Sequence, residues 1–222
     1  MIRREPGRCT TVTSEAEKSV RRIAIADLNA SAEELTNLRA ALAAGGVAGI
    51  PTETFYGLAT NPKSEGGVRR IIEAKGRDDG KPMPVLFATR EQLEHLGVTA
   101  RAEVLDRFFL LWPAPLTVVL PIERPIAASR GLSTLAVRMP ASRSLILLLE
   151  SVGAVTGTSA NPSGEPALAD PDAVAAAFSG RLDLLVDGGR TPGEAPSTIV
   201  DATVEPPAVV REGAHRWTGG AC

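Results

Sequence analysis

The chain has 222 residues, of which 44% are hydrophobic and 23% are charged, as is typical of a soluble globular protein. Its formal net charge of −2 indicates no general attraction to nucleic acid or to anionic membranes. Cys9 and Cys222 lie at opposite ends of the sequence, which excludes a paired-cysteine zinc site. No apolar run approaches the roughly 20 residues that cross a bilayer. We expect a cytoplasmic protein with no membrane partner.

Composition divides the chain into one domain with an extension at each end. Residues 1–22 are rich in arginine and lysine and contain few large apolar side chains, which predicts a flexible N-terminal extension. Alternating helical and extended patterns begin at Ile23. We therefore place the domain at residues 23–215 and a C-terminal tail at residues 216–222.

Capping residues and apolar spacing predict helices and short strands in alternation. Ser31 with Glu34 makes a capping box at the start of the first helix. Ser64 caps a second helix that ends at Lys75, where Gly76 suits a left-handed turn. The other predicted helices begin at Thr89, Glu103, Leu145 and Pro171. The predicted strands cover residues 47–50, 117–120, 135–137, 155–158, 184–186, 198–200 and 209–210. Their irregular order predicts an α/β domain with a mixed sheet rather than a doubly wound parallel sheet.

Several common catalytic and cofactor motifs do not occur in the sequence. It has no Gly-x-Gly-x-x-Gly fingerprint and no Gly-x-Ser-x-Gly elbow. Segment 76–82 is similar to a phosphate-binding loop, but it has one residue too few between its glycines, and Pro82 stands where Ser or Thr would bind magnesium. His95 and His215 have polar surroundings that indicate surface positions. These observations disfavour a nucleophilic triad and a histidine metal site, and we predict no resident metal.

Polar side chains gather at the ends of predicted strands. Thr52 and Thr54 follow the strand that ends at Ile50, where loop residues of α/β sheets commonly contact ligands. The alternative is a proline-initiated turn whose hydroxyls bond their own backbone. Ser159 and Asn161 follow another strand, and a structural turn is again the alternative.

Five cations occupy similar positions at the ends of elements. They are Lys75, Arg77, Lys81, Arg138 and Arg211. The first three crowd one glycine-bracketed loop, where they repel each other unless an anion or the two aspartates after Arg77 offset them. The dipole of a helix C-terminus accounts for one of them. The whole set favours a site that holds phosphates and a carboxylate.

Seven motifs follow one another in an order that is similar to a known family. They are Pro-Thr-Glu-Thr-Phe-Tyr-Gly-Leu at 51–58, Lys-Gly-Arg at 75–77, Trp-Pro-Ala-Pro-Leu-Thr at 112–117, Ala-Val-Arg-Met-Pro at 136–140, Thr-Ser-Ala-Asn-Pro-Ser-Gly at 158–164, Ser-Thr-Ile-Val-Asp at 197–201 and Arg-Glu-Gly at 211–213. Together they resemble the YrdC-type family of threonylcarbamoyl-adenylate synthases, in its short single-domain form, across about residues 23–215. The resemblance implies an α/β (α+β-like) domain with a twisted mixed sheet, flanking helices and a deep concave basic cavity.

The resemblance also implies a reaction. L-threonine, bicarbonate and ATP would become threonylcarbamoyl-adenylate and pyrophosphate, so that the protein would be a nucleotidyltransferase. ATP would be a substrate, and Mg²⁺ would accompany the nucleotide. The product would serve the modification of adenosine beside the anticodon of certain tRNAs, through a downstream threonylcarbamoyl-transferase complex.

The family's functional positions map onto this chain one by one. The catalytic positions correspond to Lys75, Arg77, Ser159 and Asn161. The positions that contact threonine correspond to Thr52, Thr54, Arg138, Thr158 and Ser197. The positions that contact ATP correspond to Arg77, Lys81, Thr134, Ala160 and Arg211. We expect Lys75→Ala to remove a cavity charge but no core contact.

Three positions depart from the family's pattern. Asp78 follows Lys-Gly-Arg where proline is common, and Ala114 replaces a usual glycine. Leu86 stands where many relatives carry a histidine near the threonine, which argues against a histidine contact with the substrate.

Two alternative functions fit parts of the sequence. One is a double-stranded RNA or tRNA-binding module without catalysis, against which the sequence pI of about 5.8 counts. The other is a carbamoyl-transfer domain of the hydrogenase-maturation type. Those proteins carry paired-cysteine zinc fingers, and this sequence has no such pairs.

Overall fold

The computed structural model describes residues 20–76 and 80–219. Its helices are α1 (Ile25–Ala30), α2 (Ala32–Ala43), α3 (Glu65–Lys75), α4 (Arg90–His95), α5 (Ala102–Phe109), the 3₁₀ helix η1 (Ala127–Ser129), α6 (Arg143–Val152) and α7 (Pro171–Ala177). Its strands are β1 (Arg21–Ala24), β2 (Ala48–Ile50), β3 (Gly57–Ala59), β4 (Val85–Leu86), β5 (Leu116–Pro121), β6 (Thr134–Arg138), β7 (Val155–Thr156), β8 (Thr158–Ser159), β9 (Leu184–Asp187), β10 (Thr198–Asp201) and β11 (Ala208–Arg211). None of the described helices is long and apolar enough to cross a membrane.

Hydrogen bonds at the helix ends confirm the predicted caps. The Ser31 hydroxyl accepts from the Glu34 amide at 3.2 Å at the start of α2. The Ser64 hydroxyl accepts from the Gly67 amide at 3.1 Å at the start of α3. Gly76 has φ of 62°, in the left-handed region that glycine adopts without strain, and it ends α3 as predicted.

Five elements form where the sequence analysis predicted none, namely β1, α1, β3, β4 and η1. Strand β1 begins at Arg21, inside the stretch expected to be an extension, and pairs with β9 in parallel at the edge of a sheet. Its side chains are mostly exposed, so it carries no apolar run. Helix α1 follows it directly. Strand β3 is the short sequence Gly-Leu-Ala, and its pairing with β2 and β8 rather than its own propensity makes it a strand.

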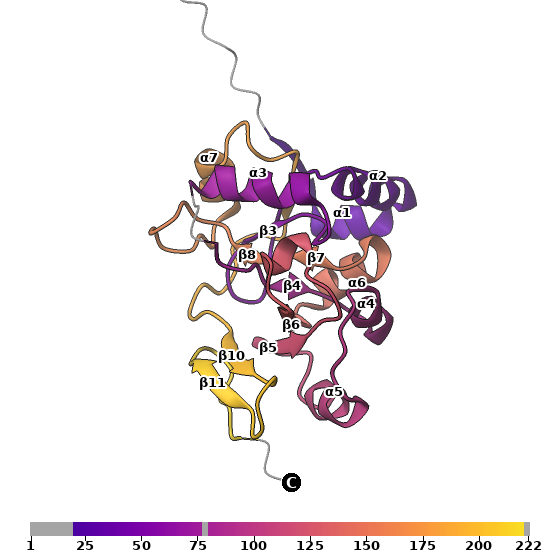
Figure 1. Cartoon of the computed structure of the whole chain (residues 1–222). Coiled ribbons are helices and arrows are strands. Elements are labelled where there is room, and N and C mark those ends of the chain that lie inside the picture. The colour runs from indigo at the N-terminus through magenta and orange to yellow at the C-terminus, as the bar shows by residue number, and fades with distance from the viewer. Residues whose placement is uncertain (1–19, 77–79, 220–222) are drawn as a thin grey trace, which may run out of the picture.

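The predicted mixed α/β architecture is confirmed, but the strands form two sheets rather than one. The five-stranded sheet has the order β1-β9-β2-β3-β8, and the six-stranded sheet has the order β11-β10-β5-β6-β4-β7. Both contain parallel and antiparallel pairs. In Figure 1, α3 and α7 lie at the top of the molecule, while β10 and β11 lie at the bottom.

Gly157 is the point where the chain passes from one sheet to the other. Strand β7 ends at Thr156 in the six-stranded sheet, and β8 begins at Thr158 in the five-stranded sheet. The Leu86 side chain of β4 lies against Gly157, so that a Cβ there would be 2.5 Å from Leu86 Cγ. Glycine therefore allows the two sheets to approach closely at this point.

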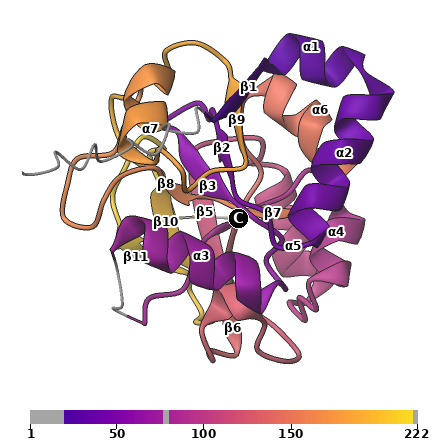
Figure 2. The same cartoon turned by 90° about the horizontal axis from the view of Figure 1, so that it is seen from above.

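A leucine-rich cluster lies under α1, α2 and α6, which contact one another beside the five-stranded sheet (Figure 2). Leu28, Leu38 and Leu145 of these helices pack with Ile50 of β2 and Val186 of β9. A larger cluster fills the space around the six-stranded sheet and includes the contact between Phe87 and Trp112, whose ring centroids are 5.0 Å apart. The sheets are thus fixed on both sides by apolar packing.

We predict that Gly157→Ala lowers the free energy of unfolding by about 1–3 kcal/mol, because the new methyl group overlaps Leu86. Urea unfolding followed by circular dichroism measures the change. Gly66→Ala on α3 is the matched control, since a Cβ there meets only Ser64 Oγ at 4.0 Å. An equal effect of the two substitutions would contradict the assigned role of Gly157.

Candidate functional site

The turn between β2 and β3 contains a chain of hydroxyl hydrogen bonds with a fixed direction. Thr52 Oγ1 donates to the Phe55 carbonyl at 2.7 Å. Thr52 and Thr54 hydroxyl oxygens are 2.9 Å apart, and because the Thr52 proton is already used, Thr54 is the donor in this pair. Both threonines are buried. The turn therefore has, in part, the hydroxyl-to-backbone hydrogen bonds of the alternative prediction. The Thr54 hydroxyl also contacts Arg138.

Arg138, the last residue of β6, lies against this turn. Its Nη1 and Nη2 atoms are 3.5 Å and 3.4 Å from Thr54 Oγ1. Its Nη2 also forms an ion pair with Glu53, and the two side chains are 8% and 16% exposed. Sequence reasoning assigned no role to Glu53. The requirement of a buried arginine for a counter-charge was the signal that could have identified it.

A second arginine comes from β11, an edge strand of the six-stranded sheet, whereas Arg138 lies on the interior strand β6. Arg211 of β11 donates to the Ser197 carbonyl at 2.7 Å and to the Ser197 hydroxyl at 3.3 Å. That hydroxyl also bonds Thr117 of β5 at 2.9 Å. Burial, and then the positive charge of Arg138, lower the pKa of Arg211. The two predicted groups therefore lie close enough for their charges to interact.

Lys75, Ser159 and Asn161, three of the four predicted catalytic residues, are in direct contact. Lys75 Nζ donates to the carbonyls of Ser159 and Asn161 at 2.5 Å and 2.8 Å, and to Asn161 Oδ1 at 3.1 Å. Ser159 Oγ donates to the same Oδ1 at 2.6 Å. Ser159 pairs with Gly57 of β3, directly after the threonine turn. The fourth residue, Arg77, lies outside the described residues.

Lys75 differs from its expected setting. The sequence predicted a cavity charge without core contacts, but the residue is only 4% exposed, and its ammonium group holds the 159–161 loop through three oxygen acceptors. Its carbonyl also accepts from the Ser163 amide at 2.8 Å. Lys75 therefore has a structural role, and its catalytic role stays a prediction.

The remaining predicted residues lie in several different parts of the fold. Thr158 is buried and neighbours Ser159 on β8, so the two side chains point to opposite faces. Ala160 donates its amide to the Tyr56 carbonyl at 2.8 Å. Thr134 begins β6, at the opposite end of the strand from Arg138. Lys81 is exposed.

Leu86, which stands where many relatives carry a histidine, is a core residue here. It is 1% exposed, pairs with Arg138 across β4 and β6, and belongs to the leucine-rich cluster. Its side chain packs against Gly157. The other departures are Ala114, which is buried, and Asp78, which lies outside the described residues.

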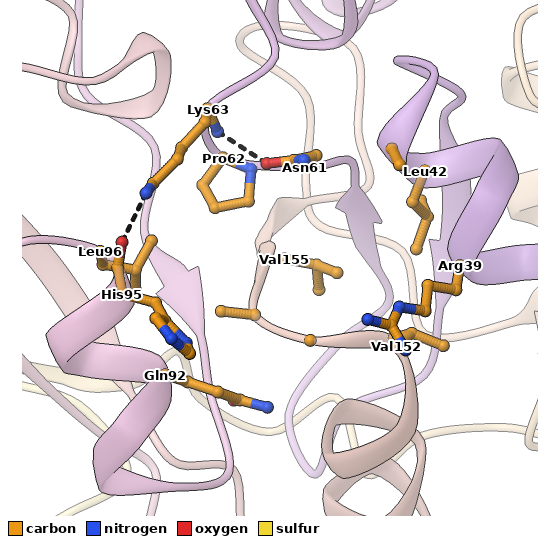
Figure 3. A pocket seen from close by; sticks show the side chains of 13 residues that line it. Arg39, Leu42, Asn61, Pro62, Lys63, Gln92, His95, Leu96, Val152 and Val155 are labelled. Carbon is orange, nitrogen blue, oxygen red and sulfur yellow. Dashed lines mark hydrogen bonds between the residues drawn. The ribbon is translucent and has the colours of Figure 1, made fainter.

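Two cavities flank these groups without enclosing them. One has a volume of about 280 Å³ and touches the threonine turn through Thr52 and Glu53. The other, also about 280 Å³, is shown in Figure 3, with Arg39, Lys63 and His95 around an apolar floor, and none of the predicted site residues lines it. Among the described residues, no group of three or more His, Cys, Asp or Glu side chains could hold a metal ion.

Together the two arginines, the lysine and the hydroxyls define a site suited to anions, on a fold with two mixed sheets. The Sua5, YciO and YrdC family model, described as telomere recombination, matches residues 40–213, and the chain belongs to this family.

Relatives with established names include a threonylcarbamoyl-AMP synthase of Pyrococcus abyssi, which is 41% identical over 76% of this chain and 51% of its own length. A threonylcarbamoyl-AMP synthase of Thiobacillus denitrificans is 37% identical over 74% of this chain and 88% of its own length. The chain spans about half the length of the first curated relatives that it matches.

Solved structures show the same fold. The crystal structure of P. abyssi Sua5 complexed with L-threonine has a TM-score of 0.76 and 34% identity, and the match covers 87% of this chain and 56% of that one. E. coli YciO, at 23% identity and a TM-score of 0.71, shares the fold over 83% of this chain and 91% of its own.

We predict that Lys75→Ala lowers the free energy of unfolding by about 1–3 kcal/mol, because it leaves the oxygens of the 159–161 loop without their charged donor. Lys63→Ala is the control, because Lys63 is exposed and, among the described residues, its ammonium donates to the His95 carbonyl alone. Thermal and urea unfolding of both variants measure the difference. A Lys75→Ala protein as stable as the Lys63→Ala protein would show that Lys75 does not support the loop.

Proposed function

We propose that this chain is an L-threonylcarbamoyladenylate synthase, a nucleotidyltransferase that converts L-threonine, bicarbonate and ATP to threonylcarbamoyl-AMP and pyrophosphate. The names of its curated relatives support this reading. The observation that carries it is the buried Arg138, in contact with Thr54 and close to Arg211, because this geometry provides fixed donors for a carboxylate beside a second cation.

The reaction joins two anions, and this determines what the protein must supply. The threonine amine attacks the carbon of CO₂ derived from bicarbonate, a C–N bond forms, and the amine proton is released. A carboxylate oxygen of this carbamate then attacks the α-phosphorus of ATP, the bond from that phosphorus to the β-phosphate bridge breaks, and pyrophosphate leaves. Repulsion between the carbamate and the triphosphate is the main obstacle, so cations that stabilise the developing charge, together with positioning, provide the catalysis.

The residues divide between the two substrates. Arg138 binds the threonine carboxylate, with Thr52, Thr54, Thr158 and Ser197 around the amino acid. The nucleotide is bound by Arg77, Lys81, Thr134, Ala160 and Arg211, and Mg²⁺ arrives with the triphosphate. Lys75 and Arg77 act on the phosphates, and Ser159 and Asn161 position them. No protein nucleophile takes part.

The product is an activated carbamoyl group and needs an acceptor. We propose a downstream transferase complex in the cytoplasm that moves the threonylcarbamoyl group to adenosine beside the anticodon of tRNA. Direct tRNA binding by this chain would then be secondary to catalysis.

The test is a reaction of the purified protein with L-threonine, bicarbonate, Mg²⁺ and ATP, followed by mass spectrometry. We expect threonylcarbamoyl-AMP and pyrophosphate in equal amounts, and no product when threonine or bicarbonate is omitted. If a folded protein forms neither compound but binds tRNA with a steep salt dependence, the chain is an RNA-binding module and the proposal is wrong.

We predict that Arg138→Lys raises the KM for threonine by about 10- to 100-fold and changes the KM for ATP little, because lysine cannot make the two parallel bonds that arginine offers a carboxylate. Steady-state kinetics with each substrate varied in turn measure this. Arg90→Lys on α4 is the control, since Arg90 pairs with Asp106 at the surface. Equal threonine KM values in the wild type and the Arg138→Lys variant would contradict the role of Arg138.

A further inference from the structure

Glu53 has an unusual environment for a carboxylate. Both of its oxygens are buried and neither accepts a hydrogen bond of normal geometry within the described part of the chain. Its interaction with Arg138 is an ion pair in which the arginine Nε likewise donates to no partner. A buried ion pair that lacks supporting hydrogen bonds contributes little to stability, because desolvation offsets the attraction between the charges. Stability alone therefore does not explain why Glu53 and Arg138 are buried together.

The charges around Arg138 indicate a further reason. Arg138 and Arg211 are near enough that the first lowers the pKa of the second, after the larger effect of burial. Two neighbouring guanidinium groups repel, and Arg211, which is exposed at the end of β11, is held by the Ser197 carbonyl and hydroxyl, which are neutral acceptors. Glu53 is the acid that contacts Arg138. Among the described contacts, the charge of Glu53 is the one that offsets the repulsion between the two arginines.

We propose that Glu53 is a positioning residue that holds the Arg138 guanidinium against Thr54, so that the carboxylate of the substrate amino acid meets donors already in place. This inference rests on the proposed function, in which Arg138 binds that carboxylate. In this proposal Glu53 acts through Arg138 and not on a substrate, since its carboxylate oxygens are buried and its ion pair is with Arg138. An arginine that is fixed before binding loses less conformational freedom when it binds, which favours affinity.

The experiment compares Glu53→Gln and Glu53→Asp with the wild type in steady-state kinetics. For Glu53→Gln we expect the threonine KM to rise about tenfold or more, while kcat and the ATP KM change by less than about threefold. Glu53→Asp keeps the charge but retracts it by one methylene. Its threonine KM should lie between those of the wild type and Glu53→Gln. Glu34→Gln is the control, because Glu34 makes an ion pair with Arg21 on the surface of α2.

Coupling to Arg138 separates positioning from a general effect on the fold. If Glu53 acts through Arg138, Glu53→Gln combined with Arg138→Lys should bind threonine no more weakly than Arg138→Lys alone. Additive losses, equal losses for threonine and ATP, or a lower threonine KM in Glu53→Gln would each overturn the inference. The last result would show that Glu53 competes with the substrate for Arg138.

A structure with L-threonine gives a test that needs no variant. The inference requires that Arg138 keeps its contact with Glu53 while it binds the threonine carboxylate, and loss of that contact would overturn it. A wild-type protein that neither binds threonine nor forms product would instead overturn the proposed function. The two failures are thus distinguishable.

Discussion

The candidate site depends on the close approach of the two sheets at Gly157. Strand β7 pairs with β4, and β4 pairs with β6, whose last residue is Arg138. One residue later, β8 pairs with β3 and so leads back to the threonine turn and forward to Asn161. A side chain at Gly157 would overlap Leu86 of β4 at this junction. The anion site is a property of this junction more than of any one loop.

The two arginines of the site differ in exposure and in partners, since Arg138 is buried and Arg211 is exposed at the end of β11. Arg138 is held by an acid, whereas the described contacts of Arg211 are to a carbonyl and a hydroxyl. Neutral acceptors satisfy the guanidinium hydrogens without cancelling the charge, so Arg211 keeps its attraction for an incoming anion. Burial also lowers the pKa of Arg211, but an arginine begins from so high a value that it stays charged. The positive charge of Arg211 is therefore present at the site before any ligand enters.

Caps and apolar spacing among neighbouring residues predicted the helices α2 to α7. Pairing between distant strands determined the features that the sequence could not indicate. Ser31, Ser64 and Gly76 were identified because caps depend on neighbouring residues alone. The division into two sheets, the strand β1 and the pairing of β3 with β8 depend on partners more than 90 residues away, which no local pattern encodes. The grouping of Lys75 with Ser159 and Asn161 was predicted from the order of motifs, but the burial of Lys75 was not. Glu53 was missed because its role exists only beside Arg138.

The direction of the hydroxyl chain in the threonine turn has a consequence for molecular recognition. Because Thr52 donates to the Phe55 carbonyl, Thr54 must spend its only proton on Thr52. Thr54 can then act only as an acceptor toward anything else, as it does toward Arg138. A ligand group that approaches Thr54 must bring its own proton, as an ammonium or hydroxyl group does, and a carboxylate must turn toward Arg138. One backbone carbonyl thus determines which groups of a ligand can face Thr54.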